Sequence, residues 1–480
     1  MGGSAFVKNP FEDRAGLGWM SSAFGDLVVG QRRDLVTGTF VHGLPSLAFQ
    51  RVERWDAAGG AGSLTANERV VGGTSNAVGI VEDVVSPIRI RVLSGVFQSG
   101  ETITGVGVSA ATTGGSRVIT KNAAVNGEVT TSNSIATVAS GTAATGSCAL
   151  ESAHLGPYSA GHELGSLFTA AFKTDAFVSG VDAFIGMFNR GGANGMGVGH
   201  LGSGPGIGKH GLVVRRAGVS TFVPYDQFNI DPFDGNGPSG QTWDPSKINI
   251  FRFQMGYLGV YGVLLSIVGT DGKWYPAHFY TAINSGLSAF ILDPHLTMRA
   301  EVTKTAAGAV EAAAYTASWN VYAVAPTSID LAPQRPNGYL RAAASITTGA
   351  ERYLFSVLNK LTYAGVANNT PLRLVSVSLS TDAGATQSCV FRIRRNTPLA
   401  GATFNDVSAL NSCASVDVAA SSGFTGGDAV WNRQLGSNGA VVDDLRGENI
   451  VIGPGESITI TAETTSTQSI RPAFRWEEVH

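Results

Sequence analysis

The sequence predicts an all-β, multi-domain protein, built from antiparallel, jelly-roll-like β-sandwich units and a small β module rich in Ala, Gly and Thr. Glycine supplies 62 of the 480 residues, about twice its usual share of roughly 7%. Charged residues make up 14%, against about 25% in an ordinary soluble domain, which disfavours long amphipathic helices. Short alternating runs of β-branched and aromatic residues between turn residues are typical of strands.

Shifts in composition divide the chain into four segments. We expect an N-terminal docking segment (1–62), a small-residue β module (63–150), a central β-sandwich (151–325) and a C-terminal β-sandwich (326–480). The first segment is too thin for a core of its own, so it is either an arm that docks on a neighbour or a first strand pair of the next domain. The Pro-rich junction APTSIDLAPQRPNG precedes the last unit.

The module 63–150 is predicted to form short strands. In IRIRVLSGVF, Ile88, Ile90 and Val92 fall on one face and the two arginines between them on the other. Phe97 is the module's only aromatic residue. Small side chains bury little apolar area each, so we expect the module to depend on partners for stability.

The central segment restores the aromatic residues. LFTAAFKTDAFVSGVDAFIGMF fits either a helix or two strands, and strands are favoured because its phenylalanines are broken by SGVD. In INIFRFQM, Phe251, Phe253 and Met255 share one face and are predicted to line the inside of a sandwich.

The next strands are predicted to form a hairpin. Asp271-Gly272 supplies residues that accept the positive φ of a tight turn. Trp274 and Tyr275 then point to opposite faces of the returning strand. Pro276 lacks an N–H group, so it should lie on an edge strand or at a bulge.

The C-terminal segment contains clear strand candidates in LRLVSVSLSTDAG, SCVFRIRRNT, SVDVAA and NIVIGPGESITITAETT. GPGES is a turn, and SITITA alternates cleanly after it. Together these runs predict a second antiparallel sandwich.

Several functional classes are disfavoured by composition. The net charge of −3 and pI of about 6.3 give no basic footprint, so no nucleic-acid partner is expected. The start MGGSAFVKNPFEDRAG lacks an apolar secretory core, and no run approaches a membrane span, so no membrane insertion is expected. The cysteines Cys148, Cys389 and Cys413 are predicted to be buried free thiols, with a Cys389–Cys413 disulfide as the alternative.

The glycine-rich run GGANGMGVGHLGSGPGIGKHG (191–211) contains G-x-G-x-x-G, but its glycines continue where a nucleotide-binding helix would have to begin. We therefore expect a long exposed loop there, and no cofactor.

One stretch combines carboxylates with aromatic residues. Tyr225, Asp231, Asp234 and Trp243 are the candidate contacts for a glycan. A calcium site within 226–240, with Asn236 as a further ligand, is one alternative, and a pair of glycosidase carboxylates is another. Because the same residues also suit a polar loop over a sandwich, no catalytic residue and no metal ligand is assigned.

Three segments resemble proteins of tailed-bacteriophage virions. LSGVFQSGETITG resembles small β modules of such virion proteins, and WDPSKINIFRFQMGYLGVYGVLLSIVGTDGKWYPAHFYTAIN is similar to a segment that recurs in phage structural proteins. NIVIGPGESITITAETTSTQSIRPAFRWEE is similar to the last hairpin of appendage and fibre proteins, with its G-E-S turn and terminal W-x-E.

The resemblance implies a non-enzymatic structural component of a tailed-phage virion, assembled in the host cytoplasm. It implies an oligomeric appendage or decoration protein, anchored through its N-terminal part to other virion proteins and closed as a homotrimer. The alternative is a receptor-binding tail fibre that contacts host-surface polysaccharide, and a polysaccharide depolymerase is a further one. The resemblance supplies no catalytic residues.

Overall fold

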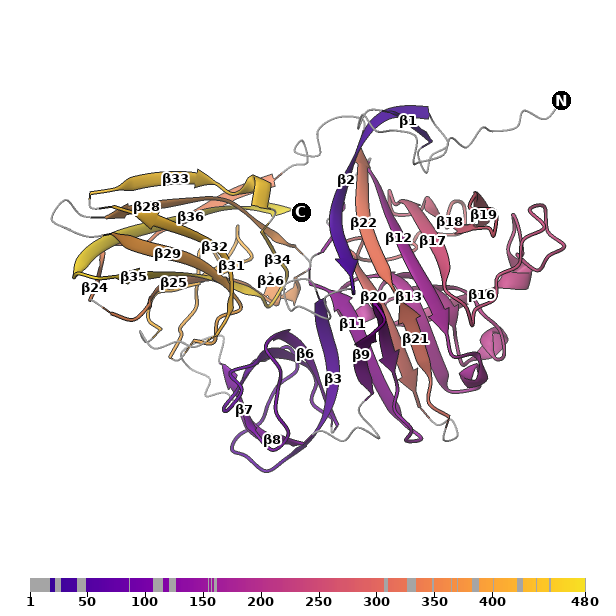
Figure 1. Ribbon diagram of the computed structural model, residues 1–480, viewed down its shortest axis with the longest axis horizontal. Coiled ribbons are helices and arrows are strands. Elements are labelled where there is room, and N and C mark those ends of the chain that lie inside the picture. Colours follow the sequence, from indigo (N-terminus) through magenta and orange to yellow (C-terminus); the bar gives the residue numbers. More distant parts are fainter. Residues whose placement is uncertain are drawn as a thin grey trace. The chain divides into compact units, whose positions relative to one another are not determined.

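The computed structural model describes residues 18–21, 27–40, 49–85, 87–106, 115–120, 127–153, 155–156, 158, 162–305, 310–325, 334–347, 349–363, 365–368, 370–381, 388–399, 401–420, 426–436, 438–448 and 450–479. Strands dominate these residues, and the helices among them are single 3-10 turns. The all-β, multi-domain prediction is confirmed (Figure 1).

The chain folds into two compact units, each made of two separate pieces of sequence. Unit 1 comprises residues 1–49 and 123–332, and unit 2 comprises 50–122 and 333–480. This grouping differs from the four consecutive domains expected from composition. The difference arises because strand pairing, which composition does not reveal, joins segments that are far apart in the sequence.

Unit 1 is a sandwich of two antiparallel sheets. In sheet order, the first sheet contains β1 (Gly18–Ser21), β2 (Leu27–Thr39), β22 (Ser318–Ala325), β12 (Glu163–Phe172), β17 (Asn249–Gly256), β18 (Gly262–Val268) and β19 (Trp274–Tyr280). β21 (Ala313–Thr316), β10 (Ile135–Ala139) and β9 (Glu128–Ser132) extend it from β12. The second sheet contains β16 (Val219–Pro224), β15 (Gly211–Arg216), β14 (Gly195–His200), β13 (Val181–Phe188), β20 (Thr297–Lys304) and β11 (Gly146–Ser152).

The strands predicted in the central segment are present. Phe251, Phe253 and Met255 are fully buried between the sheets, as the alternation in INIFRFQM predicts. Pro276 lies on β19, the last strand of its sheet, next to a bulge at Ala277 of the same strand. The helix-or-strand alternative is settled as strands, since β12 ends at Phe172 and β13 begins at Val181.

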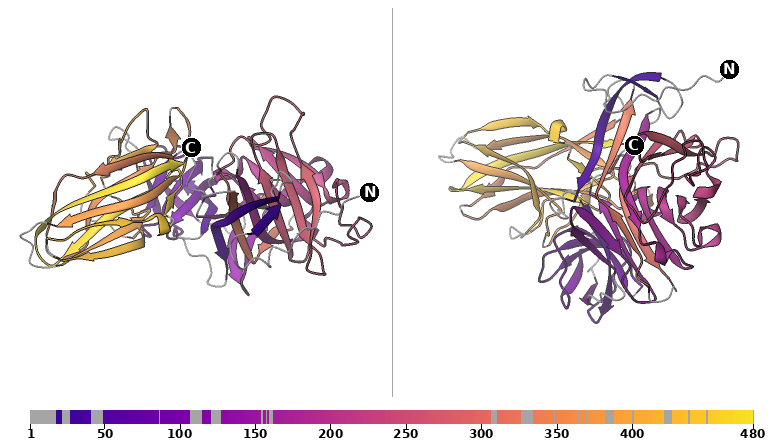
Figure 2. Two further views of the ribbon diagram at one scale, coloured as in Figure 1. Left: turned by 90° about the horizontal axis from the view of Figure 1, so that it is seen from above. Right: turned by 45° about the vertical axis from the view of Figure 1, so that its right-hand side comes forward.

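The N-terminal strands belong to unit 1. β1 pairs with β2, and β2 runs antiparallel to β22, so these two strands are a first strand pair of the sandwich (Figures 1 and 2). Residues 50–62 of the same predicted segment belong to unit 2. Residues 1–17, 22–26 and 41–48 lie outside the described residues, and the predicted anchoring through them stays a prediction.

We expected the whole glycine-rich run 191–211 to be a long exposed loop, but only its residues 201–210 form a loop with several exposed positions. Its residues 195–200 form β14, which is buried along its whole length. Gly197 faces the ring of Phe188, and a Cβ at Gly197 would lie 2.9 Å from that ring. Gly195 and Gly197 therefore leave room for the ring of Phe188 on the neighbouring strand β13.

Unit 2 contains a small closed barrel. Its strands follow the order β3 (Phe49–Ala58), β6 (Ile88–Ser94), β5 (Val78–Asp83), β4 (Arg69–Gly72), β7 (Thr102–Val106) and β8 (Ser116–Thr120), and β8 pairs back to β3. Ile88, Ile90 and Val92 lie in its core, as predicted. Trp55 from β3 packs edge-on against Phe97 with ring centroids 6.4 Å apart, so the small-residue module obtains its largest core side chain from the preceding segment.

The rest of unit 2 is the predicted C-terminal sandwich. One sheet contains β23 (Gln334–Leu340), β36 (Gln468–Val479), β28 (Leu372–Thr381) and β33 (Ala440–Asp444), with β24 (Ala344–Ile346) and β34 (Val451–Ile452) at its side. The other contains β30 (Asn405–Asp406), β31 (Ala414–Asp417), β25 (Arg352–Asn359), β35 (Ser457–Thr464), β29 (Cys389–Arg395) and β32 (Asp428–Leu435). The three cysteines are free and buried, as expected.

Candidate functional site

An aromatic stack connects the core of unit 1 to its surface. His210 precedes β15 and Tyr225 follows β16, and the pairing of these two strands brings their rings together. The rings are parallel, with centroids 4.2 Å apart and planes 5° apart. Trp243 meets His210 edge-on at 4.3 Å. The stack therefore runs from the buried Trp243, through His210, to Tyr225, whose ring is half-buried.

Trp243 does not lie where a glycan could reach it. Only 2% of the residue is exposed, and its ring packs edge-on against Phe251 in the core. The interpretation of Trp243 as a glycan contact is thus corrected to a core residue. A large apolar ring between the sheets buries more area than one on a surface loop, which favours this position.

Asp231 organises the loop in which it lies. It is 2% exposed, and its two carboxylate oxygens accept hydrogen bonds from the backbone N–H groups of Phe233 (2.9 Å) and Ser239 (2.7 Å). Phe233 is itself buried and has a φ of 53°, which a bulky side chain rarely adopts. With both oxygens engaged and almost no exposed surface, Asp231 is a loop anchor and not a glycan contact.

Asp234 is exposed, and its Oδ1 accepts a hydrogen bond from the N–H of Asn236 at 2.8 Å, which is ordinary turn chemistry. Among the described residues, no group of three or more His, Cys, Asp or Glu side chains has the arrangement of a metal site. Of the four candidate glycan contacts, Tyr225 and Asp234 thus remain at the surface, and no described contact joins them.

His210 is held in its neutral form by its surroundings. Burial lowers its pKa to about 4, against weaker opposing effects from Asp244 and Asp226. Its Nε2 atom is buried without a hydrogen-bond partner among the described residues. An uncharged ring suits its place between Tyr225 and Trp243, since a charge there would lose its water.

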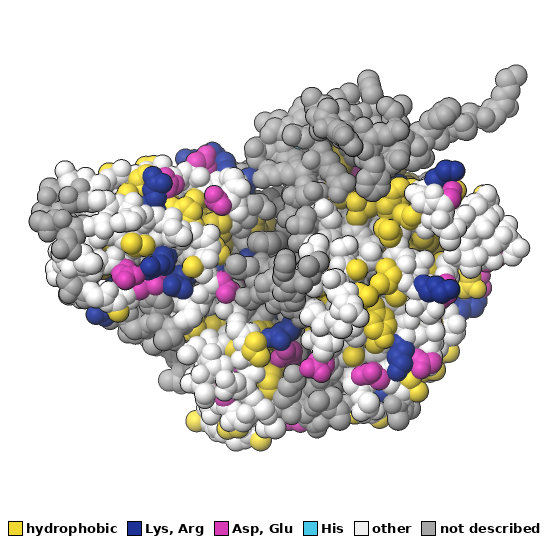
Figure 3. Space-filling view, in the orientation of Figure 1, with side chains coloured by type: hydrophobic (Ala, Val, Ile, Leu, Met, Phe, Trp, Pro, Cys, Tyr) yellow, Lys and Arg dark blue, Asp and Glu magenta, His cyan; other side chains and the backbone are white. Residues whose placement is uncertain are grey.

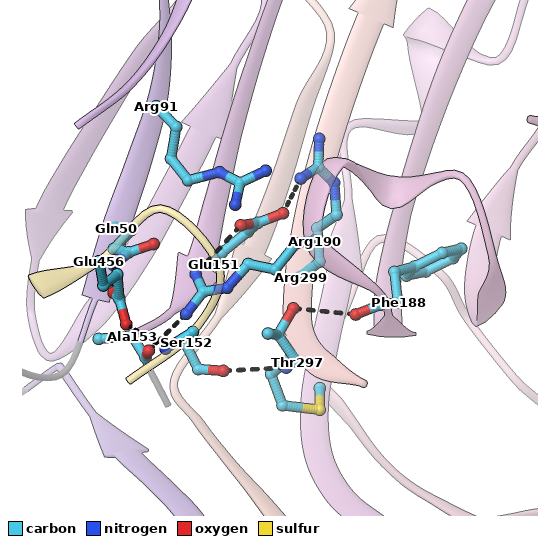
Figure 4. A network of polar contacts seen from close by, with 12 residues as sticks. Gln50, Arg91, Glu151, Ser152, Ala153, Phe188, Arg190, Thr297, Arg299 and Glu456 are labelled. Carbon is cyan, nitrogen blue, oxygen red and sulfur yellow. Dashed lines mark hydrogen bonds and ion pairs between the residues drawn. The ribbon is translucent and has the colours of Figure 1, made fainter. Parts of the chain in front are cut away.

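A second charged cluster, which the sequence did not suggest, lies on the second sheet of unit 1. Arg299 of β20 binds Glu151 of β11, and its Nε donates to Glu301 at 2.6 Å. Arg190 approaches Glu151 at 3.5 Å, and Arg215 approaches Glu301 at 3.7 Å. Figure 4 shows Glu151 between the guanidinium groups of Arg190 and Arg299.

These paired arginines and glutamates have a structural role. Glu151 and Arg299 have no exposed surface, and each of the two carboxylates contacts two arginines. A general acid or nucleophile must reach a substrate and change its protonation or bonding, which neither carboxylate can do in this arrangement. Buried, mutually paired charges are instead costly to break one at a time.

The motifs that carry the resemblance also have structural roles. Glu101, from SGETITG, accepts a hydrogen bond from the N–H of Gln98 at 2.6 Å and holds the turn at residues 74–75. Glu456, from GPGES, pairs with Arg395 at 2.7 Å. Glu478, from the terminal W-x-E, is fully buried and accepts a hydrogen bond from the N–H of Cys413 at 3.1 Å. These glutamates fix turns and strand ends of unit 2.

Two loops at one end of unit 1 expose aliphatic side chains. The loops are residues 257–261, between β17 and β18, and 281–292, after β19. We call their exposed aliphatic residues the apolar tip. Its members, with their exposed fractions, are Leu258 (57%), Val260 (38%), Ile283 (49%), Leu287 (108%) and Leu292 (54%).

The backbone of the apolar tip is well fixed. The N–H of Ala282 donates to Val260 O at 3.1 Å, and the N–H of Phe290 donates to Gly259 O at 2.9 Å. The hydroxyl of Tyr257 donates to Ile291 O at 2.9 Å. Neither loop contains a charged residue. The uncharged run TAINSGLSAFIL is the sequence signal for this surface, which we did not predict.

The known proteins that resemble this chain are solved structures of low sequence identity. No family model matches the sequence, and no curated protein matches it. Similar solved structures include lectin II from Ulex europaeus, at 14% identity over 41% of this chain and 90% of that chain, with a TM-score of 0.27. They also include an immunostimulatory antigen and pseudo β-1,3-glucanase of Mycobacterium tuberculosis (11% identity, 41% and 78% covered, TM-score 0.27).

An endo-β-1,4-glucuronan lyase from Trichoderma reesei is a third similar structure, at 12% identity over 41% of this chain and 86% of that chain, with a TM-score of 0.26. At such identities and TM-scores, these similarities support no conclusion about what this chain binds or does. Among the described residues, no helix is long and apolar enough to cross a membrane.

Proposed function

We propose that this protein is a non-enzymatic structural component of a virion of the tailed-phage type, and that it docks on a neighbouring protein of the particle through the apolar tip. The observation that carries the proposal is the apolar tip itself. Five aliphatic side chains are held out in solvent by a hydrogen-bonded backbone, in loops without any charge. Grouped exposed apolar side chains mark surfaces that another protein covers.

The resemblance of three segments to virion proteins supports the same proposal. One of these segments, 243–284, forms β17, β18 and β19 and carries three of the five residues of the apolar tip on its loops. The stretch that most resembles virion proteins therefore also presents the surface with the strongest features of an interface.

Particle incorporation tests this proposal. Leu287 is fully exposed, so Leu287→Glu should leave the fold intact and still place a carboxylate in the contact. We expect mass spectrometry of purified particles to detect the wild-type chain and to show at least a tenfold loss of the Leu287→Glu chain. The matched control is Leu410→Glu, at an 83% exposed position of unit 2, which should be incorporated normally. Absence of the wild-type chain from particles refutes the proposal.

Glycan binding is a second candidate function, supported by Tyr225. His210 covers one face of its ring at 4.2 Å, so the exposed part of the half-buried residue lies on its other face and edges. Sugars stack on such fixed aromatic faces. Lys209 and Asp226 form an exposed ion pair at 2.5 Å and supply polar groups. Lys209 directly precedes His210 in the sequence, and Asp226 directly follows Tyr225.

A glycan array distinguishes this candidate from the first. Binding of the wild-type protein to a host-surface polysaccharide, lost in Tyr225→Ala and kept in Tyr225→Trp, would support it. The control Trp243→Phe should keep binding, because Trp243 is buried. An array without any bound glycan eliminates the candidate and leaves the docking proposal untouched.

A further inference from the structure

Arg252 of β17 lies on the outer face of the first sheet of unit 1, because the two phenylalanines that flank it point into the core. Arg252 pairs with Ser266 of β18, and Ser266 pairs with Pro276 of β19. Trp274, two residues before Pro276 on the same strand, therefore shares this face. Figure 3 shows hydrophobic side chains gathered in the region where Figure 1 shows β12 and β17.

The side chains of Arg252 and Trp274 are in contact. The guanidinium carbon of Arg252 lies 4.8 Å from the centre of the Trp274 ring. A cation over an indole face is attracted by the electrons of the ring, and this contact orients both side chains. Both residues are half-buried, so each keeps some surface that a ligand can reach. Together they present a flat apolar ring beside a positive charge.

Arg252 has few hydrogen-bond acceptors within the protein. Its Nε is buried without a hydrogen-bond partner among the described residues, and its Nη2 lies 3.5 Å from Ser266 Oγ, at the limit of a hydrogen bond. In the described part of the chain, no Asp or Glu forms an ion pair with it. Glu163 lies on the same face, but it is 4% exposed and accepts a hydrogen bond from Gln254 at 3.2 Å.

Arg215 of β15, on the other sheet of unit 1, is a structural arginine with which Arg252 can be compared. Its guanidinium also lies over an aromatic ring, 4.6 Å from the centre of Phe184. Its Nε donates to Ser220 at 3.0 Å, and its Nη1 lies 3.7 Å from Glu301. Arg252 has the same kind of aromatic contact without such acceptors. Its N–H groups are therefore available to a carboxylate from outside the chain.

We propose that Arg252 and Trp274 form a binding site for a carboxylated sugar, the uronate residue of an acidic polysaccharide. The planar guanidinium presents N–H groups that can bind both oxygens of a carboxylate. The indole beside it offers a flat apolar surface on which the sugar ring can stack. A carboxylate on a protein side chain would use the arginine without the flat surface of the indole, so the pair favours a sugar.

This inference goes beyond the proposed function. The site lies on β17 and β19, whereas the apolar tip lies on the loops that follow these strands, and Tyr225 follows β16 of the other sheet. Membership of a particle and glycan binding at Tyr225 can therefore each fail without affecting the site at Arg252.

Isothermal titration calorimetry of the full chain with a hexuronate oligosaccharide tests the site. The comparison ligand is the neutral oligosaccharide in which each carboxyl group has been reduced to a hydroxymethyl group. We expect the wild type to bind the uronate and to bind the neutral sugar at least about tenfold more weakly. Arg252→Gln should weaken uronate binding by about a hundredfold, and Arg252→Lys by about tenfold, because lysine keeps the charge without the planar fork.

The matched control is Arg216→Gln, which removes the same charge from an exposed position of β15 on the other sheet and should bind the uronate like the wild type. Tyr225→Ala should also bind it normally, which separates this site from the second candidate function. The inference is overturned if the wild type does not bind the uronate, or if the neutral sugar or a polyglutamate peptide binds as tightly. Normal uronate binding by Arg252→Gln would also overturn it. Circular dichroism of each variant checks that the fold is retained.

Discussion

Two long loops of unit 1 have opposite relations to its core. The loop from 226 to 244 is rich in aromatic residues and carboxylates, and it directs Phe233, Trp243 and Asp231 inward. The loop from 281 to 292 has no charge, and it holds Leu287 entirely in solvent. The aromatic and carboxylate residues of the first loop thus fix the fold, whereas an uncharged aliphatic residue of the second loop forms exposed surface. The comparison shows that a functional interpretation needs the direction of a side chain as well as its type.

The two loops should differ most in how strongly an alanine substitution lowers the free energy of unfolding. Trp243→Ala removes a ring that packs against Phe251 and His210 and should lower the free energy of unfolding by about 3–5 kcal/mol. Leu287→Ala should change it by less than about 0.5 kcal/mol, because the residue is exposed. Urea denaturation, followed by circular dichroism, measures both. Equal losses of unfolding free energy in the two variants would contradict the difference between the two loops.

The aromatic stack should make unit 1 sensitive to acid. The pKa of His210 is about 4 in the folded protein, below its ordinary value of 6.5. The unfolded chain therefore binds more protons between these values, so this contribution to stability is complete above pH 6.5 and is lost as the pH falls towards 4. Its size should be about 3 kcal/mol.

The variant His210→Phe isolates this effect, because it keeps an aromatic ring against Tyr225 and removes the titrating group. Its free energy of unfolding, measured from pH 6.5 to pH 4.5, should fall less than that of the wild type. Parallel pH curves for the two proteins would show that His210 is not the group responsible.

The two candidate carboxylates should differ from each other. Asp231→Ala leaves two backbone N–H groups without acceptors and should cost about 1–3 kcal/mol of stability. Asp234→Ala loses one hydrogen bond in an exposed turn and should cost less than about 0.5 kcal/mol. Thermal unfolding of the pair provides the check, and a larger loss in Asp234→Ala would contradict the assignment of Asp231 as the anchor.

The smallest stability effect is expected where the effect on assembly is greatest. The free energy of unfolding of Leu287→Glu should differ from that of the wild type by less than about 0.5 kcal/mol. Guanidinium denaturation of this variant separates a docking defect from a folding defect. A loss above about 2 kcal/mol would mean that Leu287 supports the fold. Reduced incorporation of Leu287→Glu into particles would then reflect a folding defect and would not indicate a docking defect.

The alternation of residues was sufficient to predict several elements. Phe251, Phe253 and Met255 line the core because a strand places every second side chain on one face. Trp274 and Tyr275 lie on opposite faces, with Trp274 beneath Arg252 and Tyr275 against the core. Such predictions depend only on neighbours along one strand.

Features that depend on distant segments were not predictable. Nothing near Trp55 in the sequence shows that β3 closes a barrel with β8, since the pairing joins residues about 60 positions apart. The buried position of Asp231 depends on N–H groups that its own loop presents only after folding. The alternate glycines of β14 became interpretable only beside Phe188.

Photo-crosslinking inside intact particles tests the central claim most directly. A photoreactive amino acid placed at position 287 in the apolar tip should give crosslinks to a neighbouring polypeptide, whereas the same group at position 410 should give few, although both positions are exposed. Crosslinks from 410 with none from 287 would contradict the claim that the chain docks through these two uncharged loops.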